Sequence, residues 1–193
     1  MSPVLGVIAS SNQQGRVGNT GAYEPISVVN VPSAGITSIT FGSIPQTYTH
    51  LQLRSTVRPT LASDVVLRLN SDATAANYYT HIINGTGAGS VGAGAASTYY
   101  QGGMGIGYHD IALANCFGAH ITDILDYTNT SKNTTIRTLF GVDYNNAGGG
   151  QVSFGSGAWF NNAAITTITL YLLSGSGNVF AQNSSIALYG IKG

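Results

Sequence analysis

The chain has 193 residues, of which only 7% are charged, against roughly 25% in an average soluble protein. Seven basic and seven acidic residues give a formal net charge of zero, which provides no general attraction to nucleic acid or to an anionic membrane. The hydrophobic fraction of 43% excludes a disordered chain, and no apolar run reaches the roughly 18 residues that a membrane helix needs.

The first 25 residues show no periodicity. Small apolar residues are mixed there with Gly, Asn and Gln, which predicts an extended N-terminal arm over residues 1–25. The apolar stretch 4–9 is interrupted by Gly6, and the first basic residue, Arg16, follows it rather than precedes it. This order does not fit a secretory signal peptide, so we expect a protein that is not secreted by that route.

The rest of the chain is dominated by strand patterns. Five windows alternate apolar and polar residues with a period of two: 51–58, 65–70, 136–142, 167–172 and 186–191. Five more windows are rich in β-branched and aromatic residues: 26–31, 36–41, 78–83, 120–126 and 151–160. Turn residues separate them, and no window of ten residues has helical amphipathicity. This pattern predicts an all-β, single-domain antiparallel β-sandwich over residues 26–193, with a jelly roll as the closest template and extra strands at an edge.

One internal segment departs from the strand pattern. Residues 85–107 hold nine glycines in 23 positions. Ordering such a chain costs much conformational entropy, so we expect a long Gly-rich loop there.

The sequence gives little support for catalysis. Glycoside hydrolysis needs two carboxylates that face one bond, and Asp123 and Asp126 are three apart on an expected strand, so they would face opposite sides. Cys116, the only cysteine, cannot form an internal disulfide, and its place beside Phe117 favours a small half-buried hydrophobe over a nucleophile. We therefore expect no enzymatic activity.

Metal and cofactor sites have equally little support. The four histidines, His50, His81, His109 and His120, are not spaced as ligand pairs, and we expect them at strand ends or interfaces. Residues 70–74 gather oxygens that a calcium ion could use, but an Asx-stabilised turn is favoured because calcium sites usually collect several carboxylates. We expect no metal and no cofactor.

Basic residues suggest one docking patch. If Leu51 and Leu53 point inward, Arg54 and Arg58 share the outward face, and Arg68 points outward from the following strand. We predict that Arg54, Arg58 and Arg68 form a patch that docks on an acidic protein surface. The alternative is a solvated face balanced by nearby Asp64.

Neighbouring aromatic residues suggest a second kind of contact. One residue of each pair on an expected strand should face away from the core. We take Tyr78, Tyr79 and Trp159 as candidates for stacking on sugar rings or anchoring a subunit interface. Single exposed aromatic residues are also ordinary, and that is the alternative.

Four segments together resemble structural proteins of tailed bacteriophages. They are residues 44–54 (IPQTYTHLQLR), 65–70 (VVLRLN), 77–81 (NYYTH) and 185–191 (SIALYGI). The resemblance covers roughly residues 36–83 and 119–193, and it lies in strand order and turn residues rather than in a catalytic signature. It implies a virion protein, made in the host cytoplasm, of the kind that forms cement or decoration proteins, head fibres or tail-associated trimers.

We therefore expect a capsid cement protein that binds the outside of a phage head. The resemblance implies a jelly-roll homotrimer that contacts the major capsid protein or another virion protein. The low charge agrees with a surface buried between subunits, although a Thr-, Ser- and Asn-coated β-protein explains the composition equally well. The alternative is a carbohydrate- or receptor-binding module of a phage tail or fibre, because jelly rolls often serve as lectins.

Overall fold

The structure is a computed structural model, and it describes residues 22–86, 88–89, 91–96, 100–109, 113–144, 149–173 and 175–192. Twelve strands and one short 3-10 helix are found in this part of the chain. The strands are β1 (Tyr23–Asn30), β2 (Ser38–Phe41), β3 (His50–Val57), β4 (Ser63–Leu69), β5 (Tyr78–Thr86), β6 (Val91–Ala96), β7 (Met104–His109), β8 (Gly118–Leu125), β9 (Thr134–Val142), β10 (Gln151–Trp159), β11 (Ile168–Leu172) and β12 (Ser185–Ile191), and the helix is η1 (Ala75–Asn77).

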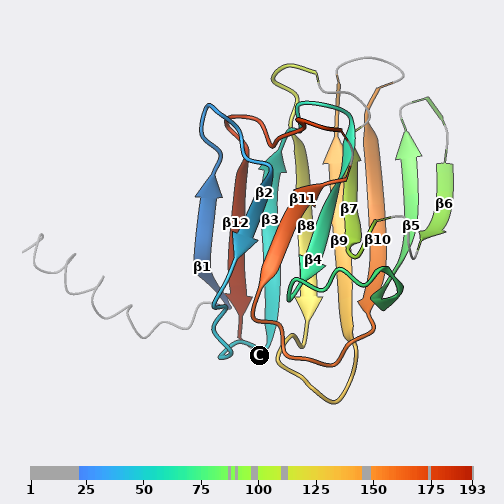
Figure 1. The fold of residues 1–193 in the computed structure, drawn as a ribbon. Helices are drawn as coiled ribbons and strands as arrows, with labels where there is room; N and C mark the ends of the chain where they lie inside the picture. The colour runs from blue at the N-terminus through green and yellow to red at the C-terminus, as the bar shows by residue number, and fades with distance from the viewer. Residues whose placement is uncertain are drawn as a thin grey trace, which may run out of the picture.

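The strands form two antiparallel sheets that pack as a sandwich (Figure 1). The larger sheet has eight strands in the order β1-β12-β3-β8-β9-β10-β5-β6, and the smaller has four in the order β2-β11-β4-β7. The predicted all-β sandwich is therefore confirmed. The jelly-roll topology stays a prediction, since the strands divide into eight and four rather than into two equal sheets.

Alternation of apolar residues produces this sandwich. In β3, Leu51, Leu53 and Val57 are buried while Arg54 and Thr56 are exposed. The two inner faces meet in one core cluster that draws on both sheets and on residues as distant as Val31 and Leu188. Burial of an aliphatic side chain contributes about 1.5–3 kcal/mol, so this cluster is the main source of stability.

The first strand begins earlier than expected. Tyr23, Glu24 and Pro25 pair with β12 instead of belonging to an arm, because Glu24 forms an ion pair with Lys192 and accepts a hydrogen bond from the Tyr48 hydroxyl. The remainder of the predicted arm, residues 1–21, lies outside the described residues.

The predicted loop over residues 85–107 is wrong in part, because it contains β6 and most of β7. These strands form because the glycines allow close packing, which the number of glycines in a sequence does not reveal. A Cβ atom at Gly105 would collide with the ring of Tyr100, and one at Gly107 would lie 2.5 Å from Nε2 of His120. These glycines make room for core side chains instead of loosening the chain.

Candidate interaction surface

An apolar row crosses the outer face of the eight-stranded sheet. Ile121 on β8 lies opposite Leu139 on β9, and Leu139 lies opposite Phe154 on β10. Phe154 in turn lies opposite Ile83 on β5. The exposed fractions are 43% for Ile121, 50% for Leu139, 49% for Phe154 and 60% for Ile83. Directly opposed side chains lie about 5 Å apart, so the four form one continuous row.

A second row beside it contains apolar residues and glycines. Val152 on β10 lies between Gly85 on β5 and Gly141 on β9, and Gly85 also lies opposite Val91 on β6. Val152 and Val91 are both exposed. We call Ile83, Val91, Ile121, Leu139, Val152 and Phe154 the apolar face.

The two glycines of this row line two hollows in the apolar face: Gly85 lines both, and Gly141 lines only the larger one. A hollow of about 240 Å³ is lined by residues of both rows, including Gly85, Val152 and Phe154. A Cβ atom at Gly141 would meet only the Gln151 carbonyl oxygen, at 4.0 Å, and one at Gly85 only Cγ1 of Val152, at 4.0 Å. Neither glycine is required by packing, so a side chain at either position would project into a hollow of the surface.

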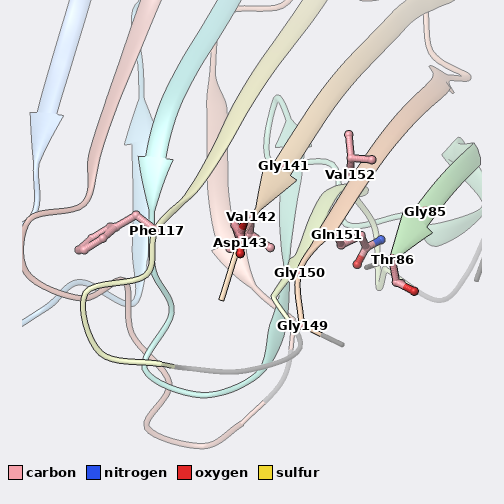
Figure 2. A pocket seen from close by; sticks show the side chains of 10 residues that line it. All are labelled: Gly85, Thr86, Phe117, Gly141, Val142, Asp143, Gly149, Gly150, Gln151 and Val152. Atoms are coloured by element: carbon pink, nitrogen blue, oxygen red, sulfur yellow. The ribbon is translucent and has the colours of Figure 1, made fainter. Parts of the chain in front are cut away.

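A larger hollow, of about 590 Å³, continues the apolar face toward the ends of β5, β9 and β10 (Figure 2). It shares Gly85, Gly141 and Val152 with the second row. Figure 2 shows Phe117, from the segment before β8, standing apart from the other lining side chains. Asp143 is the only titratable lining residue among those described, so the hollow offers no acid and base pair of its own.

Polar side chains border the apolar face on its other side. The next outward row consists of Asp123, Arg137, Ser156 and His81, each opposite the next across β8, β9, β10 and β5. Arg137 Nη2 lies 3.8 Å from Asp123 Oδ2. An apolar centre with a polar rim is the usual anatomy of a protein interface.

The three arginines predicted to form a patch do not come together. Arg54 lies on the outer face of the eight-stranded sheet, whereas Arg68 lies on β4 of the four-stranded sheet and faces the opposite side of the sandwich. Arg58 follows β3 and is half-buried, with its guanidinium 5.9 Å from the centre of the Phe117 ring. The patch was predicted on the assumption that consecutive strands share a sheet, and β3 and β4 do not.

The side chains of Arg54 and Arg68 both form hydrogen bonds and ring contacts within the chain. Arg54 Nε donates to Oε1 of Gln52 at 2.7 Å, and the guanidinium stacks over Tyr23 and Tyr189. Arg68 donates to the carbonyl oxygens of Gln101 and Gly102 and stacks over Tyr171. Arg68 therefore holds the segment before β7 in place.

Two of the three predicted contact aromatics are in the core. Tyr78 and Trp159 are each 1% exposed, and they face one another across β5 and β10 with ring centres 6.5 Å apart. Only Tyr79 points outward, with its ring 5.1 Å from that of His81. Of the neighbouring residues Trp159 and Phe160, it is Phe160 that is exposed.

The oxygen-rich loop is held as a turn by protein donors. Asp72 Oδ1 accepts from the Thr74 backbone at 2.9 Å, and Oδ2 accepts from Asn77 at 2.7 Å and from Trp159 Nε1 at 2.9 Å. Burial raises the pKa of Asp72, but these hydrogen bonds outweigh burial and lower it to about 2. Asn70 Oδ1 accepts from the backbone of Thr166 in the same way.

Two histidines meet between the sheets instead of lying at interfaces. His109 on β7 and His120 on β8 are buried with ring centres 5.6 Å apart, and both pack on Phe140. His120 Nδ1 lies 3.1 Å from the Ser55 hydroxyl, while neither Nε2 has a hydrogen-bond partner among the described residues. Burial lowers the pKa of His109 to about 4 and that of His120 well below its usual value.

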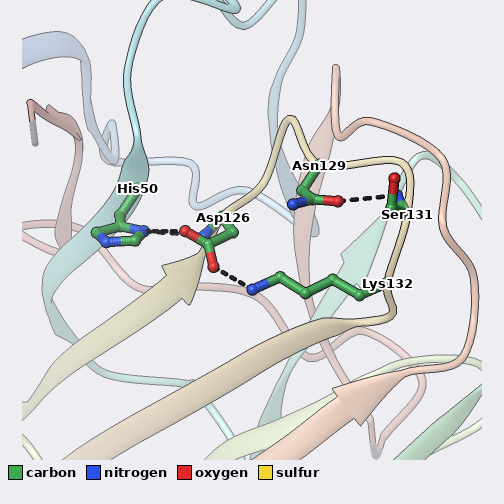
Figure 3. A network of polar contacts seen from close by, with 5 residues as sticks. All are labelled: His50, Asp126, Asn129, Ser131 and Lys132. Carbon is green, nitrogen blue, oxygen red and sulfur yellow. Dashed lines mark hydrogen bonds and ion pairs between the residues drawn. The ribbon is translucent and has the colours of Figure 1, made fainter.

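His50, Asp126 and Lys132 form a partly exposed network at the turn from β8 to β9 (Figure 3). His50 Nδ1 accepts the Asp126 backbone N–H at 2.9 Å and lies 3.2 Å from Oδ1 of the Asp126 carboxylate. The hydrogen bond from Lys132 lowers the pKa of Asp126. Within the same turn, Asn129 Oδ1 accepts from the Ser131 backbone. The network closes the turn.

No protein-family model matches the chain, and a search of curated proteins found no similar sequence. Among the residues that the structure describes, no three His, Cys, Asp or Glu side chains gather as metal ligands would. The described part of the chain also has no helix with the length and apolar character to span a membrane.

Sequence reasoning missed the apolar face, although its signal was present. The alternation of residues 136–142 already places Leu139 outward while Phe140 and Val142 point inward. Val152 and Phe154 alternate with Ser153 in the same way. Each outward apolar residue is ordinary by itself, and only the register between β8, β9, β10 and β5 shows that they are neighbours.

Proposed function

We propose that the protein is a non-enzymatic structural component of a virion. In this proposal it is a cement or decoration protein that binds the outside of a phage head as a homotrimer and stabilises contacts between shell subunits. The resemblance of residues 36–83 and 119–193 to phage structural proteins supports the class, and the apolar face supplies a surface for attachment.

The apolar face is the observation that carries the proposal. Monomeric soluble proteins rarely expose large contiguous apolar patches, and larger ones usually mark interaction sites. Here the apolar face spans five neighbouring strands, from β8 to β6. Its six side chains are uncharged, and Arg54 on β3 lies opposite Ile121 at one end of the row. The face therefore suits a partner surface that is apolar at its centre, and in this proposal the partner is the major capsid protein.

The mechanism is attachment through several contacts at once. A trimer presents three copies of the apolar face, and each additional contact on the shell forms at high effective concentration. Opening the shell then requires several contacts to break together. No chemical step is needed, which agrees with the structural role of the His50, Asp72 and Asp126 networks.

The alternative carbohydrate-binding function loses two of the three aromatic residues on which it rested. Tyr78 and Trp159 are in the core and cannot stack on a sugar ring. Tyr79 remains as one exposed ring beside His81. The outward residues around Phe154 are aliphatic, and they offer few hydrogen bonds to sugar hydroxyls.

Binding to phage shells that lack the protein tests the proposal. We expect Leu139→Asp to reduce binding by at least about tenfold, because a carboxylate would be buried against an apolar partner. Thr135→Asp is the matched control, since Thr135 is exposed on the same face of β9, outside the apolar face. Equal binding of wild type and Leu139→Asp would contradict the role of the apolar face, and absence of wild-type binding would contradict the proposed function.

A further inference from the structure

The two sheets of the sandwich have four edges, and three of them are protected against pairing with another strand. Edge strand β1 carries Pro25, its register with β12 shifts between Pro25 and Ser27, and Glu24 and Lys192 form an ion pair at its start. Proline, bulges and charges are the devices by which proteins close a sheet edge.

The edges of the smaller sheet are also closed. Strand β2 has only four residues. Strand β7 is mostly buried, and its pairing with β4 shifts between Val65 and Val66. Short, covered or irregular edges do not accept a further strand readily.

Edge strand β6 has none of these devices. Its six residues, VGAGAA, contain no charge and no proline, and they pair with β5 without a register shift. Val91 is 82% exposed, and Ala93 and Ala95 are also exposed. No described strand lies on the far side of β6, so this edge presents backbone donors and acceptors to an incoming strand.

A slot lies on the inner side of the same edge. It has a volume of about 110 Å³ and is lined by Thr80, Ile82, Gly94, Ala95 and Tyr100. A Cβ atom at Gly94 would meet only Ile82 Cγ1, at 3.8 Å, so the absence of a side chain there keeps the slot open. Thr80 is 2% exposed, and its hydroxyl has no hydrogen-bond partner among the described residues.

We propose that β6 accepts residues 4–9 of a second copy of this chain as an additional strand. This segment, VLGVIA, is uncharged and apolar on both faces of an extended strand, so it matches both the slot and the exposed side of β6. The inference rests on the proposed homo-oligomer, and it names the segment and the edge that hold the copies together.

The position of the chain start supports a second copy as the donor. The described chain begins at Ala22, beside β1, which is the opposite edge of the sheet from β6 (Figure 1). Seven strand spacings of about 4.8 Å separate the two edges, or roughly 34 Å. Residues 10–21 join the segment 4–9 to Ala22 and reach at most about 45 Å when fully extended. This is little more than the distance to the β6 edge of the same sheet, but it is ample to enter a neighbour placed edge to edge. Head-to-tail contacts of this kind close into rings such as a trimer.

Disulfide trapping in the full-length chain tests this inference. In a Cys116→Ser background, one chain carries Ile8→Cys and a second, of different mass, carries Ala93→Cys. Mild oxidation of the mixture should give a disulfide-linked pair containing one chain of each kind. Val28→Cys replaces Ala93→Cys in the matched control, because Val28 is an exposed residue on the protected edge strand β1, and it should crosslink at least about tenfold less.

The outcomes separate the possible donors. A crosslink that forms only when Ile8→Cys and Ala93→Cys are in the same chain would assign β6 to the arm of its own chain and overturn the inference. Absence of any crosslink at position 93, or equal crosslinking at position 28, would also overturn it. The readout is independent of shells, so trapping without shell binding supports the inference and contradicts the proposed function, whereas shell binding without trapping does the reverse.

Discussion

The indole Nε1 of Trp159 donates a hydrogen bond of 2.9 Å to Oδ2 of Asp72. This bond joins the end of β10 to the turn after β4, and Asn77 donates to the same oxygen. The only tryptophan of the chain is therefore a buried structural residue, and the ionised carboxylate of Asp72 holds its indole ring in place.

We expect Asp72→Asn to destabilise the protein by about 1–3 kcal/mol. In either orientation of the amide, its nitrogen would face an N–H donor, from Thr74 on one side or from Asn77 and Trp159 on the other. Urea denaturation at neutral pH measures the change. Trp159→Phe keeps an aromatic ring and removes the N–H, so a double-mutant cycle isolates the bond, and additive effects would contradict a direct coupling.

The same carboxylate gives a pH dependence of known sign. Its pKa is lowered in the folded state, from 3.8 to about 2, so the unfolded state binds the proton more readily. The stabilisation is fully present above pH 4 and is lost as the pH falls toward 2. We expect the difference in stability between wild type and Asp72→Asn to shrink over this interval.

The buried histidine pair predicts a second loss of stability on acidification, which begins at a higher pH than the loss caused by Asp72. His109 and His120 are neutral in the folded state because burial lowers the pKa of each, that of His109 to about 4. Both gain protons more readily when unfolded, so stability is fully present above about pH 6.5 and falls between pH 6.5 and pH 4. Asp64 on β4 lies opposite Tyr108, the residue before His109.

The change of stability with pH tests the effect of the buried histidines better than the stability at any single pH. His120→Asn retains a polar group for the Ser55 hydroxyl but cannot titrate. We expect its urea midpoint to change less between pH 6.5 and pH 4 than that of wild type, even though the lost ring lowers stability at every pH. His81→Asn, at an exposed histidine, is the control and should keep the wild-type slope. An unchanged slope in His120→Asn would show that burial of this ring does not govern acid sensitivity.

The sequence predicted strand positions better than strand partners. Alternation placed the inward residues of β3 and β9 correctly because burial of one face leaves a local pattern. It did not predict that β3 pairs with β12 and β8 while β4 pairs with β11 and β7, since these partners are distant in sequence. The arginine patch failed for this reason, because Arg54 and Arg68 were assigned to one face.

The predictions made from the aromatic pairs and from the glycine content were wrong for a related reason. Which residue of a Tyr-Tyr or Trp-Phe pair points inward depends on the phase of its strand, and Tyr78 and Trp159 are in register with one another. Likewise, the glycine content of residues 85–107 does not say whether a glycine is free or covered. Gly105 is covered by Tyr100, whereas Gly141, outside that segment, is open. Tertiary packing decides both cases.

Glycines of these two kinds give the last prediction. We expect Gly141→Val to keep the protein folded, with a stability equal to wild type or up to about 1 kcal/mol higher, because valine favours a strand and a Cβ atom there meets only the Gln151 carbonyl oxygen, at 4.0 Å. Gly105→Ala should cost about 1–3 kcal/mol, because its methyl group collides with the Tyr100 ring. Thermal unfolding measures both changes.

The same pair of variants separates folding from attachment. Valine at position 141 fills the hollow beside Val152, so we expect weaker binding of Gly141→Val to phage shells despite its intact fold. Gly105→Ala leaves the apolar face unaltered, and its folded fraction should bind shells like wild type. Undiminished shell binding by Gly141→Val would mean that the partner does not enter this hollow, and it would move the contact to the row formed by Ile121, Leu139 and Phe154.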